Sequence, residues 1–101
     1  MSDLLTVRRV TVIADALFEE VITKQLGKLG AKGYTIMDCR GCGEHQIVQD
    51  LFVISSRVRI ETIVQPAVAE AIMKFIESRQ FAGRALTASV ETVQVSPRDS
   101  F

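Results

Sequence analysis

The amino-acid sequence predicts an α+β domain in which two helices cover one face of a four-stranded antiparallel sheet. Segments rich in β-branched residues, typical of strands, alternate with segments whose apolar residues recur at helical spacing. The order strand, helix, strand occurs twice along the chain. At 101 residues, the chain has room for one such domain and not for two.

Each element is predicted from its own sequence signals. The elements are strands over residues 5–14, 34–40, 57–64 and 84–95, and helices over residues 16–29 and 66–79. Asp15 stands where an N-cap is expected, because its carboxylate can accept a hydrogen bond from the first helical turn. Pro66 suits the first position of the second helix, where its missing N–H is not needed. Gly30 and Gly33 are expected to end the first helix, since glycine readily adopts the left-handed conformation common there.

The two halves of the chain align as a repeat. A shift of 50 positions places Asp15 on Gln65 and Ile22 on Ile72. Two β-α-β units of this length give the order β-α-β-β-α-β, which is the ferredoxin-like fold. Right-handed crossovers then place both helices on the same face of the sheet.

The other face of the sheet is predicted to lack a covering layer within one chain. One of two sets of side chains from the first strand lies on it: Val7, Thr11 and Ile13, or else Val10 and Val12. An exposed face that carries β-branched residues is a candidate subunit interface. The formal net charge of zero offers little electrostatic opposition to association. The sequence therefore predicts self-association.

Composition argues against several classes of protein. The chain is 48% hydrophobic and 24% charged, which is typical neither of disordered nor of fibrous proteins. Twelve Lys and Arg balance twelve Asp and Glu, so there is no global electrostatic reason to bind nucleic acid. The apolar stretches are too short to cross a bilayer, and the charges within residues 1–15 are wrong for a signal peptide. We therefore expect a cytoplasmic protein with reduced cysteines.

Residues capable of metal or redox chemistry are densest between Asp38 and His45. Cys39 and Cys42 form a C-x-x-C pair, and His45 is a third potential zinc ligand. Structural zinc sites use four ligands, so this set lacks one. A reversible disulfide is a second interpretation, although redox pairs usually open a helix and this pair follows a strand. In the third interpretation the two cysteines are small apolar residues at a strand end. The sequence leaves these alternatives open.

Catalytic machinery is not evident, and we expect that the protein is not an enzyme. The single histidine, His45, is the one candidate for acid–base catalysis, and there is no G-x-S-x-G motif. Ser55 and Ser56 have no identifiable base.

A phosphate-binding turn is a further possibility at the same place. Gly41 and Gly43 would let the backbone turn with its N–H groups exposed to an anion. Arg57 and Arg59 stand two positions apart on the next strand, so both guanidiniums share a face and can fork onto phosphate oxygens. The alternative is a solvated strand face on which Glu61 is their ion-pair partner.

Three short motifs follow one another along the chain. They are Gly33-Tyr34-Thr35-Ile36, Arg40-Gly41-Cys42-Gly43 and Arg57-Val58-Arg59-Ile60-Glu61. Their order and spacing resemble the PII-like signalling proteins, in which a K-G-x-G turn opens a mobile T-loop that returns into a V-K-I-E strand. Arg40 stands in place of the lysine of the K-G-x-G turn, and Arg59 in place of the lysine of the V-K-I-E strand. The resemblance covers residues 5–95.

The resemblance implies a homotrimer with inward-facing sheets and an adenine nucleotide (AMP, ADP, ATP or cyclic AMP) in each cleft between subunits. The implied nucleotide-binding residues are Thr35, Arg40, Gly41, Cys42, Gly43, Glu44, Arg57, Arg59 and Glu61 from one chain and Gly83, Arg84 and Ala85 from its neighbour. Residues 1–96 would form the domain, with a T-loop over about 43–56. Residues 97–101 would form a flexible tail.

The turn Phe81-Ala82-Gly83-Arg84 departs from the G-D-G-K loop of the nitrogen-sensing branch and resembles the branch linked to bicarbonate uptake and carboxysomes. Some members of that branch bind bicarbonate. The resemblance thus implies a regulator of inorganic-carbon uptake, part of a carbon-concentrating mechanism. It would contact a membrane bicarbonate transporter through the T-loop, and would be membrane-associated only through that partner. Residues 51–54 would dock on the transporter or extend a strand. The alternative is a metal-binding trimer that uses Cys39, Cys42 and His45.

Overall fold

The computed structural model describes residues 3–40, 56–98 and 101. Its strands are β1 (Leu5–Asp15), β2 (Thr35–Arg40), β3 (Ser56–Val64) and β4 (Thr87–Val95), and its helices are α1 (Glu19–Leu29) and α2 (Pro66–Ile76). Two short 3-10 turns, η1 (Ala16–Phe18) and η2 (Arg79–Phe81), precede α1 and follow α2. The predicted β-α-β-β-α-β order is confirmed.

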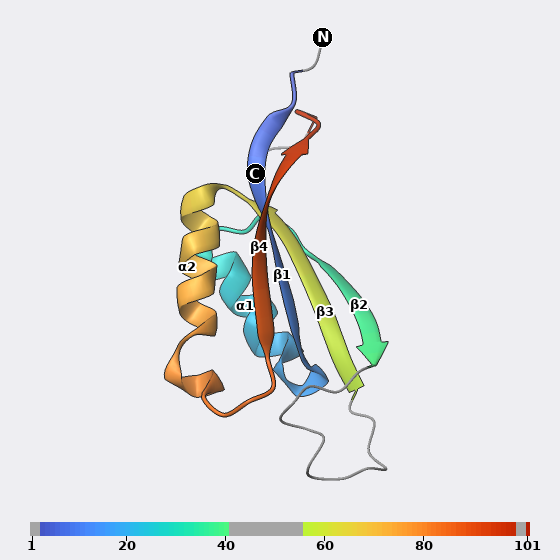
Figure 1. Ribbon diagram of the computed structural model, residues 1–101, viewed down its shortest axis with the longest axis vertical. Coiled ribbons are helices and arrows are strands. Elements are labelled where there is room, and N and C mark those ends of the chain that lie inside the picture. Colours follow the sequence, from blue (N-terminus) through green and yellow to red (C-terminus); the bar gives the residue numbers. More distant parts are fainter. Residues whose placement is uncertain (1–2, 41–55, 99–100) are drawn as a thin grey trace.

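The four strands form one antiparallel sheet in the order β2-β3-β1-β4. Both helices lie on one side of this sheet, as predicted, and β1 and β4 extend together past the helices (Figure 1). The two outer strands, β2 and β4, are therefore the free edges of the sheet within one chain.

The hydrophobic core lies between the sheet and the helices. The largest fully buried side chains in this layer include Val10 and Val12 from β1, Ile60 from β3, and Ile22 and Ile72 from α1 and α2. Ile22 and Ile72 occupy matching positions of the sequence repeat. Each half of the chain thus supplies the apolar stripe of one helix to a common core.

The helix termini follow the sequence signals closely. The Asp15 carboxylate accepts a 2.9 Å hydrogen bond from the Leu17 backbone N–H. Gly30 ends α1 with φ of +113°, whereas Gly33 does not have a positive φ and takes no part in the cap. Pro66 begins α2, and Gln65 is its N-cap residue, at the repeat position of Asp15.

Three predicted boundaries were wrong by a few residues. The first helix begins as the 3-10 turn η1, and α2 ends at Ile76 because η2 reverses the chain there. The last strand begins at Thr87 and not at residue 84. Phe81 explains the last two differences: it is 6% exposed, and the turn that buries it interrupts regular structure.

The second sheet face carries Val7, Thr11 and Ile13, while Val10 and Val12 face the helices. Ion pairs lie on this uncovered face: Arg9 binds Glu91 at 2.9 Å and Arg59 binds Glu61 at 2.8 Å. The hydrogen bond from Arg9 to Glu91, together with the charge of Glu91, raises the pKa of Arg9. The Oγ1 of Thr11 is buried without a hydrogen-bond partner in the described part of the chain. A buried hydroxyl normally has a partner, so this face is incomplete in the monomer.

Candidate functional site

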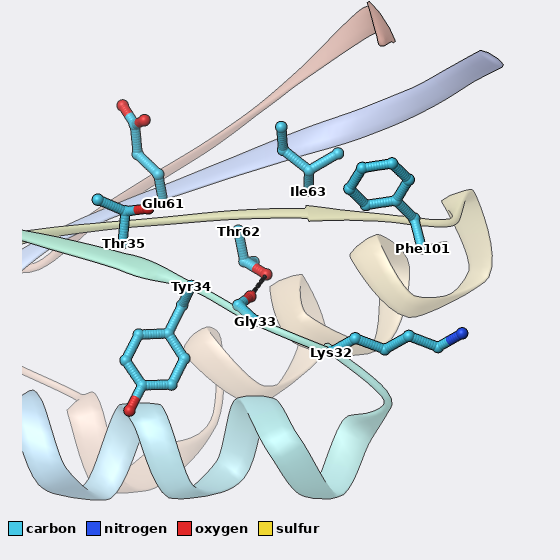
Figure 2. A pocket seen from close by; sticks show the side chains of 8 residues that line it. All are labelled: Lys32, Gly33, Tyr34, Thr35, Glu61, Thr62, Ile63 and Phe101. Atoms are coloured by element: carbon cyan, nitrogen blue, oxygen red, sulfur yellow. Dashed lines mark hydrogen bonds between the residues drawn. The ribbon is translucent and has the colours of Figure 1, made fainter. Parts of the chain in front are cut away.

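A pocket of about 470 Å³ opens beside the free edge formed by β2. Its lining comes from the turn before β2, from β2 and β3, and from the C-terminal residue, as Figure 2 shows: Lys32, Gly33, Tyr34, Thr35, Glu61, Thr62, Ile63 and Phe101. We call it the β2-edge pocket. It combines hydroxyls and a carboxylate with aromatic and aliphatic surface, a mixture that suits a small polar ligand with a flat apolar part.

The polar part of the β2-edge pocket is fixed by the β2–β3 ladder. Thr35 is the register partner of Glu61. Glu61 in turn accepts a 2.9 Å hydrogen bond from the Nε of Arg59 and pairs with its guanidinium. Below them, the Oγ1 of Thr62 donates a 2.6 Å bond to the Gly33 carbonyl, which holds the start of β2 against β3 (Figure 2). Three of the predicted binding residues, Thr35, Arg59 and Glu61, thus lie together.

The apolar part of the β2-edge pocket includes a residue that the sequence analysis missed. The Phe101 ring lies beside Ile63 (Figure 2), and the Phe101 carbonyl accepts a 3.0 Å bond from the Gln65 Nε2. Residues 97–101 were expected to be a flexible tail, and the polar sequence before Phe101 gave no sign of this contact.

A second group of predicted residues lies at the opposite edge of the sheet, beside β4. Gly83, with φ of +76°, and Arg84 follow η2. The Arg84 guanidinium lies over the Phe18 ring, 5.7 Å from its centroid. Phe81 packs edge-on against both Phe18 and Phe75, at centroid distances of 5.6 and 5.2 Å. This aromatic cluster is the base from which the loop of residues 82–86 projects.

A pocket of about 540 Å³ adjoins that loop. The C-terminal part of α2, η2, the loop and the start of β4 all contribute to its wall, and Arg84 is among the lining residues. Within the described residues, Arg84 forms no ion pair with a carboxylate, so its charge remains available to an anion.

Arg57 does not lie on an open surface beside Arg59, where the sequence predicted a pair of exposed guanidiniums. Its side chain is on the same strand face as Arg59, yet Arg57 is only 7% exposed. The Nη2 of Arg57 donates a 2.9 Å hydrogen bond to the Ala85 carbonyl. The expected pair of exposed guanidiniums is therefore absent from this face: Arg57 binds the loop of residues 82–86, and Arg59 binds Glu61.

The remaining predicted residues gather at the far end of β2 or lie outside the description. Arg40 is the last residue of β2, and Cys39 is the register partner of Arg57. Gly41, Cys42, Gly43, Glu44 and His45, together with most of the expected T-loop, lie outside the described residues.

Neither a metal site nor a membrane-spanning helix is found in the described ranges. Among residues 3–40, 56–98 and 101, no three His, Cys, Asp or Glu side chains lie close enough together to hold a metal ion. Of the proposed metal ligands, only Cys39 is described, and it is a free thiol. Within the same residues, no helix has the length and apolar character needed to span a membrane.

The fold and these two edge sites define a small ferredoxin-like domain with ligand-binding potential at both free edges of its sheet. The family model described as nitrogen regulatory protein P-II matches residues 7–100, and the chain belongs to this family.

Solved structures agree with this assignment. A PII-like signalling protein from Thermus thermophilus is 34% identical, covers 95% of this chain and 94% of its own, and superposes with a TM-score of 0.77. CPII, a nitrogen regulatory PII-like protein from Thiomonas intermedia K12 bound to ADP, AMP and bicarbonate, is 19% identical, with coverage of 96% and 100% and a TM-score of 0.79. The Bacillus subtilis GlnK–ATP complex is 20% identical, with coverage of 92% and 84% and a TM-score of 0.60. The likenesses to CPII and to GlnK, at 19% and 20% identity, show a shared fold and nothing more. A search of the curated proteins finds no match.

Proposed function

We propose that the protein is a homotrimeric regulator that senses adenine nucleotides in clefts between its subunits. The observation that carries this proposal is the placement of two polar, ligand-sized half-sites at opposite edges of one sheet. The β2-edge pocket and the loop of residues 82–86 are separated by the full width of four strands, about 14 Å at the usual strand spacing. One chain cannot close both around one ligand, whereas rotation-related copies can place β2 of one beside β4 of the next.

The uncovered sheet face supports a trimer built around that face. It buries the Oγ1 of Thr11 without a partner among the described residues, and it exposes Met37, which is 40% exposed and is the register partner of the ion-paired Arg59. A second and third copy packed here would supply hydrogen-bond partners and bury further apolar surface. Homotrimers are typical of P-II proteins, which supports the same arrangement.

The chemistry of the half-sites supports a nucleotide. We assign the base to the β2-edge pocket, where Ile63 and Phe101 offer flat apolar surface and Thr35 offers a hydroxyl. From Thr35, β2 runs five residues to Arg40, so a nucleotide whose base lies in the pocket extends along β2 toward Arg40. We assign the phosphates to that end, to Arg40 and residues 41–44 of one chain and to Gly83 and Arg84 of its neighbour. Arg59 and Glu61 would form the wall between base and phosphates.

The known ligands of relatives support adenine nucleotides as the ligand class. CPII from Thiomonas intermedia K12 has been solved with ADP, AMP and bicarbonate, and the GlnK protein from Bacillus subtilis with ATP. We extend the proposal to bicarbonate as a second ligand and to control of inorganic-carbon uptake. The output would be a contact between residues 44–56 and a membrane bicarbonate transporter, with no catalytic step in this chain.

Calorimetric titration of the purified protein with AMP, ADP, ATP and cyclic AMP, each with and without bicarbonate, tests the proposal. We expect binding of at least one nucleotide at one site per chain, weakened by Arg84→Ala. Arg98→Ala is the matched control, because Arg98 is an exposed arginine outside both half-sites. A protein that sediments as a monomer, or that binds none of the four nucleotides, would refute the proposal.

A further inference from the structure

Arg57 makes a long-range side-chain contact that joins the start of β3 to the loop of residues 82–86 of the same chain. In the proposed trimer these two segments belong to two neighbouring clefts. Its side chain is 7% exposed, and its Nη2 donates to the Ala85 carbonyl, 28 residues away, at 2.9 Å. Burying a guanidinium is costly unless its N–H groups are satisfied, and a charged donor makes a stronger bond than a neutral one. The position of Ala85 is thus tied to strand β3.

Among the described residues, the loop of residues 82–86 is held by few other contacts besides the packing of Leu86 against the core. Its backbone bonds run back to the preceding turn: Ala82 N–H donates to Arg79, and Arg84 N–H to Phe81. The Arg84 side chain rests on the Phe18 ring. Arg57 approaches from the opposite direction, past the end of β1, because its register partner Asp15 lies between it and β4. The loop is therefore held from two sides, and Arg57 supplies the side-chain hydrogen bond on the sheet side.

We propose that Arg57 is a positioning residue, which orients the loop of residues 82–86 so that Gly83 and Arg84 meet the phosphate of a nucleotide held by the neighbouring subunit. The inference rests on the proposed function and changes the role that the sequence suggested for Arg57 from direct phosphate contact to support. A planar peptide whose carbonyl is held by Arg57 must direct the N–H of Leu86 the opposite way. The bond thereby fixes the backbone immediately after Arg84.

The placement of Arg57 also connects two neighbouring clefts. On β3, it is two residues from Arg59, which serves the cleft at its own β2 edge, while the loop that it holds serves the cleft at the β4 edge. A change at one cleft that moves the start of β3 would reach the next cleft through this bond.

The test compares AMP with adenosine, because a misplaced phosphate-binding loop weakens only the ligand that has a phosphate. For Arg57→Gln we expect the ratio of AMP affinity to adenosine affinity to fall about tenfold, with adenosine affinity unchanged. Arg57→Lys retains a cationic donor but lacks the planar, forked N–H groups of the guanidinium. Its affinity ratio should lie between those of the wild type and Arg57→Gln. Lys24→Gln is the matched control, because it breaks an exposed ion pair with Glu20 on α1, lines neither pocket and should leave the ratio unchanged.

A double-mutant cycle with Arg84→Ala separates positioning from direct contact. If Arg57 acts through the loop, Arg57→Gln should have little further effect on the ratio once Arg84 is absent; if it touches phosphate itself, the two losses should add. Additive losses, or an unchanged ratio in Arg57→Gln, would overturn the inference. If Arg57→Gln fails to fold, Arg57→Lys carries the same test, and an unchanged ratio there is equally decisive. A wild-type protein that binds neither AMP nor adenosine would instead overturn the proposed function.

Discussion

The hydroxyl of Thr62 and the carbonyl of Gly33 form a 2.6 Å hydrogen bond that fastens the entry of β2 to strand β3. Thr62 is 3% exposed and lines the β2-edge pocket together with Gly33. The bond lies where the chain leaves the α1–β2 connection and enters an edge strand with only one neighbour. It thus extends the attachment of β2 to β3 beyond the ladder, which begins at Thr35.

Replacing Thr62 by Val should therefore destabilise the fold, although the two side chains have the same shape. We expect the free energy of unfolding to fall by about 1 kcal/mol, because one hydrogen bond is lost and a hydroxyl site becomes apolar. Urea denaturation followed by circular dichroism measures the change. Thr92→Val on β4 is the matched control, because Thr92 is exposed and should change stability by no more than about 0.5 kcal/mol. Equal stabilities of the two variants would show that the bond to Gly33 contributes nothing.

Two glycines three positions apart, Gly27 and Gly30, should respond in opposite directions to alanine. Gly30 has φ of +113°, and a Cβ there would lie 3.2 Å from the Val68 Cγ2, so Gly30→Ala should destabilise by about 1–2 kcal/mol. Gly27 lies within α1, and a Cβ there meets no atom within 4 Å. Gly27→Ala should stabilise by about 0.5–1 kcal/mol, because alanine loses less backbone entropy in a helix. Thermal unfolding of both variants checks the pair, and a shift of the same sign in both would contradict the helix C-terminus described here.

The order of elements could be predicted from the sequence because local signals and the buried pattern agree. Asp15 and Pro66 begin their helical segments as expected, and the alternation around Ile60 assigns the faces of β3 correctly. The ends of α2 and β4 could not be predicted in the same way. Phe81 is buried by tertiary contacts with Phe18 and Phe75, and no local sequence pattern indicates those contacts.

The candidate site was predictable to the extent that it follows strand register. Thr35, Arg59 and Glu61 gather because β2 and β3 pair, and the motif spacing already implied that pairing. Arg57 shows the limit of this reasoning: alternation gives the strand face of a side chain, but not that a long guanidinium bends toward the Ala85 carbonyl. Phe101 shows another limit, because its contact depends on where a tail with polar sequence happens to return.

Phe101 should contribute to binding of the base and not to binding of the phosphate. Its ring forms the apolar wall of the β2-edge pocket beside Ile63. We expect Phe101→Ala to weaken adenosine and AMP by the same factor, about five- to tenfold, in line with the contribution of aromatic surface to nucleobase stacking. Calorimetry with both ligands measures the two affinities, and their ratio should stay at the wild-type value.

Phe101→Leu is the matched control for that experiment. Leucine keeps an apolar side chain in the pocket and leaves the Gln65 bond to the backbone carbonyl possible, so most of any loss should come from the missing ring. Affinities that match wild type in Phe101→Ala would place the base elsewhere. A fall in the AMP to adenosine ratio would instead place Phe101 near the phosphate.

The proposed division of each site between two chains leads to a complementation experiment. Thr35→Ala damages the half-site at the β2 edge, and Arg84→Ala damages the half-site beside β4. Each variant alone should form trimers in which every cleft has one damaged half. Mixed trimers, formed by unfolding and refolding the two variants together in equal amounts, contain some clefts in which both halves are intact.

With random mixing and two independent halves per cleft, about a quarter of the clefts should regain wild-type affinity for the nucleotide. The affinity of that fraction in a calorimetric titration identifies it, and refolded samples of each variant alone should lack it. If both half-sites acted within one chain, no polypeptide in the mixture would carry an intact pair, and the high-affinity fraction would be zero. The same mixture of Arg84→Ala with Arg98→Ala serves as a reference. Arg98 lies outside both half-sites, so about half of the clefts there should bind normally.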